Sequence, residues 1–230
     1  MAAALVQASV QGVITTTTST VLMVDPITAG DTLIAACFTG GPSISGHGFT
    51  SITGGGVSWS CIQRAYDNTG GDFGVELWAG FGSIGESAGS TIVGVGGDGG
   101  GIRVTEWSGV ASLDDVAFTN NQFTPALSTP VTPTRVGDLF VVVTGAEGGC
   151  PVLSGGSPYT SLAVSTSGPP GGSDGTCGIF AYYQASDSLA HQASYTNPGL
   201  DACISACFEV PVSTGGWGAS DWATDWQLVE

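Results

Sequence analysis

The sequence predicts an all-β protein: a jelly-roll-like β-sandwich of about ten to twelve strands from two similar halves, with almost no helix. Short apolar runs rich in Val, Ile, Thr and aromatic residues recur along the chain. Glycine, at 38 residues, clusters between these runs, as is typical of turns. One phrase also occurs twice, because AGDTLIAACFTGG at 29–41 returns as VGDLFVVVTGAEGG at 136–149.

Each expected strand is an apolar run bounded by Gly, Pro, Asn or Asp. In the first half the expected strands cover residues 11–24 (as one or two pieces), 31–38, 57–64, 73–81, 90–95 and 102–108. In the second half they cover residues 138–146, 159–166, 178–185, 191–196 and 202–210. No long window has the 3.6-residue periodicity of an amphipathic helix, so we expect almost no helix.

The two halves keep the same order of features, from a Gly-Asp strand through a Gly-Gly strand and an aromatic strand to a closing aromatic strand. The matched positions are Asp31 with Asp138, Trp59 with Tyr159, Trp78 with the Tyr182/Tyr183 pair, and Trp107 with Phe208. Identity between the halves is low, so convergence on one strand pattern is the alternative to duplication. The Gly-Asp pairs themselves are typical of turns and do not indicate an active site.

We divide the chain into three parts. Residues 1–24 form an N-terminal strand or arm, and residues 25–212 form a single sandwich domain with halves at about 25–110 and 131–212. Residues 213–230 form a C-terminal tail.

Two sheets that face each other would share one core, because each sheet must cover its apolar face. The aromatic side chains of the strands then belong mostly to that core, and a ligand-stacking platform is the alternative. The residues concerned are Trp59, Phe73, Trp78, Trp107, Tyr159, Phe180 and Tyr182.

The charge of the chain excludes some partners. The formal net charge is −16, with no lysine and only three arginines. A polyanion is repelled by phosphate backbones and by anionic lipid headgroups, so neither nucleic acid nor a membrane is an expected partner. No apolar stretch has the length of a membrane helix. The start, MAAALVQASVQG, lacks the basic region of a signal peptide, so we expect synthesis in a cytoplasm without the usual export.

Six cysteines do not require disulfides in a chain of this length, and we expect free thiols. Cys203 and Cys207 would share one strand face at about 13 Å, which is too far for a bond between them. Cys150 and Cys177 lie in Gly-rich loops and are the favoured pair if a disulfide exists.

No metal or cofactor is expected. The chain has no CxxC spacing, and its two histidines are remote from the cysteines in sequence. The Asp/Gly loops at 67–72 and 171–175 lack the ligand register of an EF-hand.

Two short motifs match catalytic patterns by chance. GESAG at 85–89 has the form of a nucleophile elbow around Ser87, but a strand is expected after it where the elbow needs a helix. GVGGDG at 94–99 is likewise followed by an expected strand and offers no helix N-terminus to a phosphate. His47 and His191 have no triad context, so we interpret them as surface or structural residues.

Paired carboxylates are the remaining catalytic candidates. Asp72 with Glu76 and Asp114 with Asp115 are close in sequence, and Glu76 and Glu106 both lie in expected strands. A glycosidase would need two such groups across a cleft, about 5–9 Å apart. We expect charges on the solvent face instead, and no enzyme activity.

The tail, STGGWGASDWATDWQLVE, begins as a flexible linker and ends with Trp217, Trp222 and Trp226 among acidic residues. Exposed Trp side chains are favoured contact residues, so we interpret these three as partner-binding, whether on their own domain or on a neighbouring subunit.

The segments AGDTLIAACFTGG, GGGVSWSCIQRA, VELWAGFG and TEWSGVA together resemble a Gly/Thr-rich β-sandwich domain of secreted actinobacterial proteins and of actinobacteriophage virion proteins, including capsid decoration and minor tail proteins. The resemblance covers about residues 25–210 and implies a jelly-roll-like fold used for display or adhesion. It brings no catalytic motif.

From this resemblance we expect a non-enzymatic virion protein that decorates the capsid as a homo-oligomer and binds capsid or other virion proteins. It would be made in the host cytoplasm. The alternative is a carbohydrate- or receptor-binding module of a phage tail or of a secreted protein, with a host-surface glycan as ligand.

Overall fold

Strands form wherever β-branched and aromatic residues recur between glycines. The computed structural model describes residues 2–9, 12–13, 17–40, 48–66, 73–96, 101–122, 126–147, 152–153, 159–165, 176–196 and 201–211. Every regular element of this part of the chain is a β-strand, and all the strand pairs are antiparallel. The all-β prediction is therefore confirmed.

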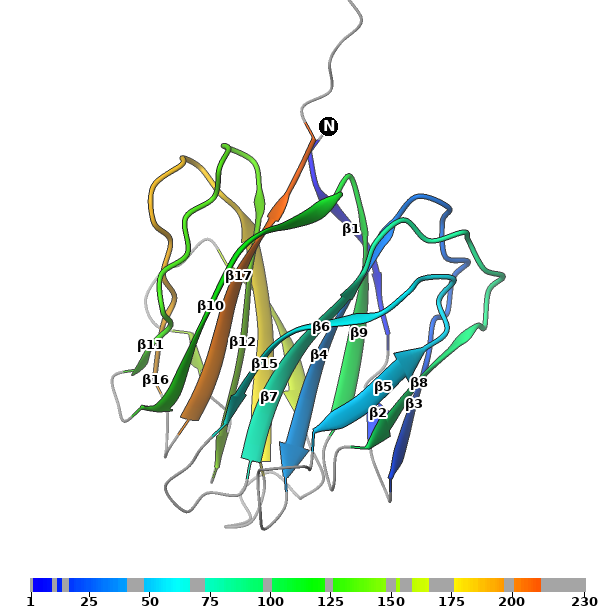
Figure 1. Ribbon diagram of the computed structural model, residues 1–230, viewed down its shortest axis with the longest axis horizontal. Helices are drawn as coiled ribbons and strands as arrows, with labels where there is room; N and C mark the ends of the chain where they lie inside the picture. Colours follow the sequence, from blue (N-terminus) through cyan, green and yellow to red (C-terminus); the bar gives the residue numbers. More distant parts are fainter. Residues whose placement is uncertain are drawn as a thin grey trace, which may run out of the picture.

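The first nine strands form one large and one small sheet (Figure 1). They are β1 (Ala4–Ala8), β2 (Gly12–Val13), β3 (Thr18–Leu22), β4 (Thr32–Gly40), β5 (Phe49–Thr53), β6 (Ser60–Tyr66), β7 (Phe73–Gly80), β8 (Thr91–Gly96) and β9 (Gly101–Ser108). The large sheet has the order β1-β9-β4-β7-β6, with β2 also paired to β9, and the small sheet has the order β3-β8-β5.

The remaining strands repeat this arrangement. They are β10 (Ser112–Gln122), β11 (Ala126–Leu127), β12 (Leu139–Glu147), β13 (Val152–Leu153), β14 (Thr160–Ser165), β15 (Thr176–Gln184), β16 (Ser194–Thr196) and β17 (Asp201–Glu209). The large sheet has the order β10-β17-β12-β15-β14 and the small one β11-β16-β13. Strand for strand this is the order of the first set, so each set is a jelly roll of two sheets.

The two large sheets pack face to face, with β7 against β12 and β4 against β15. Their shared layer is the largest apolar cluster of the described residues and takes side chains from both sets, among them Phe38, Trp107, Phe180 and Phe208. The predicted sandwich with a common core is therefore present. The small sheets cover the outer faces of the large ones over two further clusters, and the sequence did not predict these outer layers.

The Gly-Asp pairs are equivalent turns. Gly30 and Gly137 have φ angles of 93° and 94°, in the left-handed region that favours glycine. The N–H of Gly30 donates to Ser83 O at 2.7 Å, and that of Gly137 donates to Ala185 O at 2.8 Å. The prediction of turn chemistry at these two positions is confirmed.

The strand register tests the matched aromatic positions. Trp107 lies opposite Thr32 and Phe208 opposite Leu139, the residues that follow the two equivalent aspartates, so this match is confirmed.

Two further matches have different outcomes. Ala79 and Tyr182 are equivalent in register, because they pair with Ile34 of β4 and Val141 of β12. Ser60 lies opposite Ala79, and Thr160 lies opposite Tyr182. The residues before them, Trp59 and Tyr159, are therefore equivalent, which confirms this match. The match of Trp78 is wrong by one residue, because Ala79 and Gly80 hold the register positions of Tyr182 and Tyr183.

Sequence patterns missed β5, β10, β11 and β13, and they placed β1 only within the N-terminal strand or arm expected at 1–24. The longest of these, β10, contains Asp114, Asp115, Asn120 and Asn121, residue types that are depleted in strands. The strand accommodates them with register shifts at Leu113/Asp115 and Asn120/Gln122, and it continues to pair with β17.

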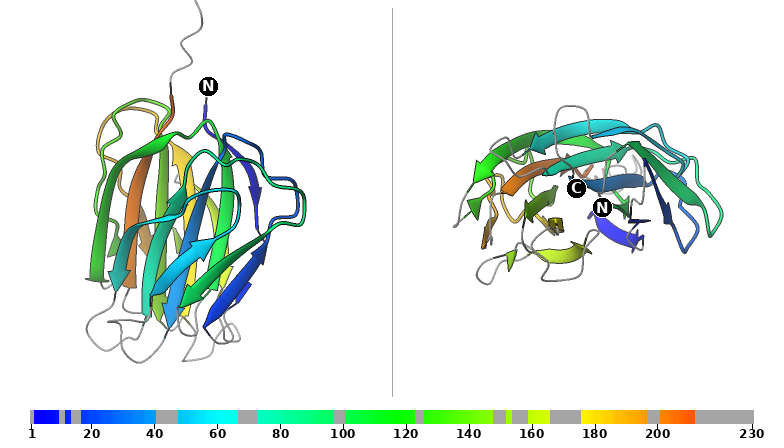
Figure 2. Two further views of the ribbon diagram at one scale, coloured as in Figure 1. Left: turned by 45° about the vertical axis from the view of Figure 1, so that its right-hand side comes forward. Right: turned by 90° about the horizontal axis from the view of Figure 1, so that it is seen from below.

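The described connections gather at one end of the molecule, the upper end in Figures 1 and 2. They include residues 54–59, 81–90, 128–138 and 185–193. The chain also enters β1 and leaves β17 at this end, which makes it the place to search for a functional site.

Packing between the two large sheets predicts the effect of one methyl group. Gly178 of β15 faces the ring of Phe38 of β4 so closely that a Cβ at this position would overlap the ring. We expect Gly178→Ala to lower the free energy of unfolding by about 1–3 kcal/mol through overpacking. Urea unfolding measures this change.

A double-mutant cycle supplies the control. Phe38→Leu alone removes apolar contacts and also destabilises, but it makes room for the new methyl group. The loss of unfolding free energy in the double variant should therefore be smaller than the sum of the losses in the two single variants. Strict additivity would contradict this packing of the sheets.

Candidate functional site

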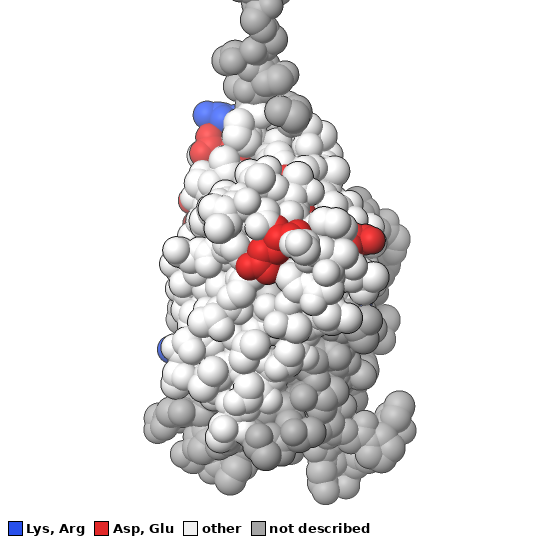
Figure 3. Space-filling view, turned by 90° about the vertical axis from the view of Figure 1, so that its right-hand side faces the viewer, with Lys and Arg blue, Asp and Glu red and all other residues white. Residues whose placement is uncertain are grey.

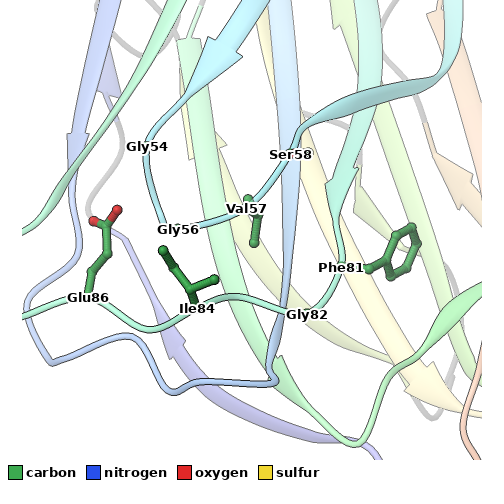
Figure 4. A pocket seen from close by; sticks show the side chains of 8 residues that line it. All are labelled: Gly54, Gly56, Val57, Ser58, Phe81, Gly82, Ile84 and Glu86. Carbon is green, nitrogen blue, oxygen red and sulfur yellow. The ribbon is translucent and has the colours of Figure 1, made fainter.

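A groove at the loop end of the first set is a candidate functional site (Figure 4). Its volume is about 510 Å³, and it lies between the loop that follows β5 and the loop that follows β7. The lining residues are Gly54, Gly56, Val57, Ser58, Phe81, Gly82, Ile84 and Glu86. The groove therefore combines a glycine floor, apolar side chains and one carboxylate.

The groove is shaped by a run of three glycines. Gly54, Gly55 and Gly56 have φ angles of 95°, 75° and 63°, a left-handed path that other residues rarely follow. The two loops are joined by hydrogen bonds, because the N–H of Ile84 donates to Gly56 O at 2.9 Å and Ser83 Oγ donates to Gly55 O at 2.9 Å. These bonds fix the floor while the Ile84 side chain stays 84% exposed.

The indole of Trp59 steadies the same loop. Its Nε1 donates to Gly54 O at 2.8 Å, and the ring is half-buried beside Val57. Sequence reasoning noted this Gly-Gly strand but missed the groove. The run GGG before a tryptophan is the signal that could have indicated it.

In the second set, aromatic rings gather among the described residues of the loop end. Tyr183 holds the register position of Gly80 and lies edge-on to Tyr159, with ring centroids 4.7 Å apart. Tyr183 also contacts His191, whose Nδ1 is hydrogen-bonded to the tyrosine hydroxyl. The described residues of the two ends therefore differ, since an aromatic ring in the second set stands where the first set has a glycine.

The chain Tyr183–His191–Asp187 has the form of a proton relay, with His191 Nε2 at 3.2 Å from Asp187 Oδ1. Burial raises the pKa of the Tyr183 hydroxyl well above its usual range, so this group is a poor nucleophile. His191 is also held by backbone bonds to Val131 in both directions. The interpretation of His191 as a structural residue is supported.

Glu76 is completely buried, so the expectation of a solvent-face charge is wrong for this residue. Its carboxylate accepts hydrogen bonds from Trp78 Nε1 at 2.7 Å and from the N–H of Phe49 at 3.0 Å, and it pairs with Arg64 Nε at 3.2 Å. Burial raises the pKa of Glu76, and the hydrogen bonds and Arg64 lower it because they favour the ionised form. Burial is the larger effect, so the pKa of Glu76 lies above its usual value. The carboxylate joins β5 to the large sheet.

Glu106 is also completely buried, which corrects the same expectation. It accepts hydrogen bonds from the N–H of Thr28 at 2.7 Å and from Gln7 Nε2 at 2.6 Å. Its neighbour Asp31 is 7% exposed. Burial and the charge of Glu106 raise the pKa of Asp31 from 3.8 to about 6, and a side-chain hydrogen bond between the two carboxyl groups adds to this.

The proposed glycosidase pair of Glu76 and Glu106 does not form. Glu76 lies opposite Cys37 of β4, and Glu106 lies opposite Leu33 of the same strand. These two positions are four residues apart, so the glutamates are separated by roughly 13 Å along the strand direction. Because they also lie on strands at opposite sides of β4, the full distance between them is larger. A pair that flanks a glycosidic bond lies closer and reaches substrate.

The carboxylates of Asp114 and Asp115, the other candidate pair, also accept hydrogen bonds from backbone N–H groups. Asp114 accepts a hydrogen bond from the N–H of Thr134 at 2.6 Å, and Asp115 accepts one from the N–H of Thr132 at 2.9 Å. Both tie β10 to the segment before β12. Asp72 lies outside the described residues.

The two chance motifs have no catalytic context. Ser87 lies in a connection that leads to strand β8 and not to a helix, as expected. Gly94 to Gly96 belong to β8, while residues 97–100 and His47 lie outside the described residues.

Among the described residues, no group of three or more His, Cys, Asp and Glu side chains is arranged to hold a metal ion. The free thiol expected at Cys207 is confirmed, and Cys203 and Cys207 are both buried on one face of β17, as expected. Cys37 and Cys61 are also free. Cys150 and the side chain of Cys177 are not among the described groups.

The aromatic residues of the strands divide into two classes. Trp78, Trp107 and Phe180 are buried, as a core interpretation predicts, whereas Trp59, Tyr159 and Tyr182 are half-buried. The half-buried rings lie at the loop end, two of them at equivalent positions. The side chain of Phe73 is outside the described set, as are the tail residues Trp217, Trp222 and Trp226.

Most of the surface on the side of the molecule formed by β3 and β8 is uncharged (Figure 3). A few acidic side chains lie at separate places on this face, and basic ones lie at its edge. Glu86, which is joined to Ile27 by a β-bridge, lines the groove, and its carboxylate disfavours anionic ligands.

No protein-family model matches the chain, and neither a curated protein nor a solved structure matches it. In the part of the chain that the structure describes, no helix is long and apolar enough to cross a membrane.

The raised pKa of Asp31 predicts how stability depends on pH. The folded protein binds a proton at Asp31 more tightly than the unfolded chain does, so stability should fall as pH rises from about 4 to about 6. Asp31→Asn removes this charge. We expect the variant to be more stable than the parent above pH 6 by about 1–2 kcal/mol, and to depend less on pH in urea unfolding.

Asp138 at the equivalent turn is the matched control. Its two oxygens accept hydrogen bonds from the N–H groups of Arg135 and Val210, each at 2.9 Å. Asp138→Asn should therefore destabilise the protein at every pH. Equal pH slopes for the parent and Asp31→Asn would contradict the carboxyl pair.

Proposed function

We propose that the protein is a non-enzymatic structural protein of a bacteriophage virion that decorates the capsid, assembled as a symmetric homo-oligomer. It would be made in the host cytoplasm and would end in the virion. The sequence resemblance to actinobacteriophage virion domains suggests this class, and three features of the described fold support it.

The observation that carries the proposal is the exposure of large apolar side chains at one end of the molecule. Ile84, Val136 and Leu189 are 84%, 67% and 69% exposed, and they come from loops of both jelly rolls. Large apolar side chains that are exposed at the same end of a molecule suit a surface that binds another protein. The loop end would therefore lie on the capsid.

The second feature is the use of the buried carboxylates. Glu76, Glu106 and Asp138 all accept backbone N–H groups from neighbouring segments, so their lone pairs are engaged in holding the fold. A catalytic acid or base must be within reach of a substrate proton. This favours a scaffold role.

The third feature is the double jelly roll, a rigid body with little basic charge. A strongly negative surface keeps a protein soluble at high copy number, as a protein displayed on every capsomer requires. Weak contacts repeated by symmetry over a lattice add up to stable attachment.

Charge substitutions at the loop end test this proposal. We expect Val136→Asp combined with Leu189→Asp to reduce cosedimentation with expanded capsids of the encoding phage by at least tenfold, because a buried unpaired charge opposes docking. The matched control is Phe118→Asp in β10, a residue that is 46% exposed on the side of the sandwich. It should bind as the parent does.

Far-UV circular dichroism confirms that each variant is folded. If the folded parent protein does not cosediment with expanded capsids, or if mass spectrometry finds none of it in purified virions, the proposal is wrong.

The groove favours a second function, a carbohydrate- or receptor-binding module. An aromatic ring and a carboxylate in the lining of one groove are an arrangement that suits a sugar ring, and Phe81, Ser58 and Glu86 line this groove. This function predicts saturable binding to a neutral glycan. An array without hits would exclude it, whereas binding that Glu86→Gln weakens and Phe118→Asp leaves intact would favour it.

A further inference from the structure

Three segments of the first set meet at the buried side chain of Glu106 in β9. Its Oε2 accepts a hydrogen bond from Gln7 Nε2 of β1 at 2.6 Å, and its Oε1 accepts one from the N–H of Thr28 at 2.7 Å. Thr28 belongs to the connection between β3 and β4. One buried carboxylate therefore joins an edge strand and a connection to the same position of β9.

The side chain of Gln7 also ties β1 directly to this connection. Its Nε2 donates to Asp25 O at 3.1 Å, and its Oε1 accepts the N–H of Asp25 at 3.1 Å. The register of β1 shifts between Leu5 and Gln7, and an irregularity of this kind re-aims a side chain. Beyond β1, the N–H of Ser9 donates to Val104 O at 2.8 Å. The hold on the N-terminal strand therefore passes through Gln7.

Asp31 is the second carboxyl group of this junction. It is nearly buried, and its side chain is hydrogen-bonded to that of Glu106. Two carboxyl groups form such a bond only when one of them carries a proton. The backbone fixes the position of Asp31, because its N–H donates to Thr28 O at 3.2 Å and its carbonyl accepts the N–H of Ser83 at 2.8 Å. The two carboxyl groups therefore cannot separate unless the connection moves.

The charged groups that surround this pair are acidic. The connection between β3 and β4 carries Asp25 besides Asp31, and a β-bridge brings the segment of Glu86 against it. Strand β1 and residues 109–111 have no charged side chain. Burial and the charge of Glu106 raise the pKa of Asp31 to about 6, so its proton is lost near neutral pH.

The three arginines of the chain do not face the pair. Arg64 and Arg135 form ion pairs with carboxylates of β7 and β17. Arg103 lies on β9 three residues before Glu106, and side chains at odd spacing leave opposite faces of a strand. An ionised Asp31 would therefore meet the charge of Glu106 with no arginine to neutralise it.

We propose that Asp31 and Glu106 form a proton-dependent latch on the N-terminal strand. With a proton between the two carboxyl groups, Glu106 holds both Thr28 and Gln7, and the junction is closed. When the proton leaves, the two carboxylates repel each other at short range, and the connection at residues 25–31 moves away from β9. Strand β1 then loses the side-chain links that Gln7 provides. This device goes beyond the proposed function, because it would act in the free protein and on a capsid alike.

Amide hydrogen exchange of the whole protein tests the latch. The reporters are three N–H groups that the junction holds, those of Thr28, Asp25 and Ser9. Their protection factors, which correct for the intrinsic effect of pH on exchange, should fall roughly tenfold or more between pH 4 and pH 7, because the closed junction binds the proton of Asp31 more tightly than the open one. The reporters should exchange without urea, whereas the amides of β12 should exchange only as urea opens the whole fold.

Asp31→Asn removes the titrating group and keeps the contact. An amide side chain donates to the carboxylate of Glu106 at every pH, so protection of the reporters should stay high and constant. Asp25→Asn is the matched control, because it removes an exposed acidic charge from the same connection. It should keep the fall that the parent shows.

Gln7→Ala tests the route to β1. In this variant Thr28 should keep its dependence on pH, whereas Ser9 should be weakly protected at both pH values. Protection at Thr28 that is constant in the parent, or that falls equally in Asp31→Asn, overturns the latch. So does a fall that needs the same urea concentration as the exchange of β12, because the change would then belong to the whole fold. A Ser9 amide that still follows pH in Gln7→Ala overturns the coupling to β1.

Discussion

The apolar layer between the two large sheets is the contact on which the other features depend. Strand β4 sends Ile34, Ala36 and Phe38 into this layer and Leu33, Ala35 and Cys37 into the cluster under its own small sheet. Both faces of the strand are therefore covered, and apolar side chains predominate on both. The same holds for β12, where Leu139, Val141 and Val143 face the shared layer while Phe140 and Val142 face the second small sheet. Removing one set would expose the inner face of the other.

The two jelly rolls share a strand order but differ in chemistry. Glu76 and Glu106 of the first set stand at register positions that Ile179 and Cys207 occupy in the second. The first set therefore holds buried charges, which need hydrogen bonds from Trp78, Arg64, Thr28 and Gln7. The second set is apolar at these positions and carries aromatic rings at its loop end. Because the shared layer holds the common frame, the loop ends can differ in chemistry without loss of the fold.

The sequence predicted the parts of this fold that repeat or alternate. The Gly-Asp turns, the central strands and the common core follow from local patterns, and the phrase AGDTLIAACFTGG reads as continuous apolar because both faces of β4 are buried. The small sheets were not predicted as separate layers, and β11 and β13 had no expected strand because each has only two residues. The burial of Glu76 was missed because its partners Phe49, Arg64 and Trp78 lie on three different strands. No local pattern reports a contact of that kind. The groove likewise depends on two loops that meet only in the folded chain.

The position of the chain ends relative to the sheets has a mechanical consequence. Strand β1 is an edge strand that pairs only with β9, and its register shifts between Leu5 and Gln7. Strand β17 lies inside its sheet and pairs on both sides, with β10 and with β12. A pulling force at the loop end would open the β1 ladder one bond at a time from Ala4, whereas β17 would resist through two ladders at once. A tether on the N-terminal side would therefore yield first, and a tether on the C-terminal side would bear load.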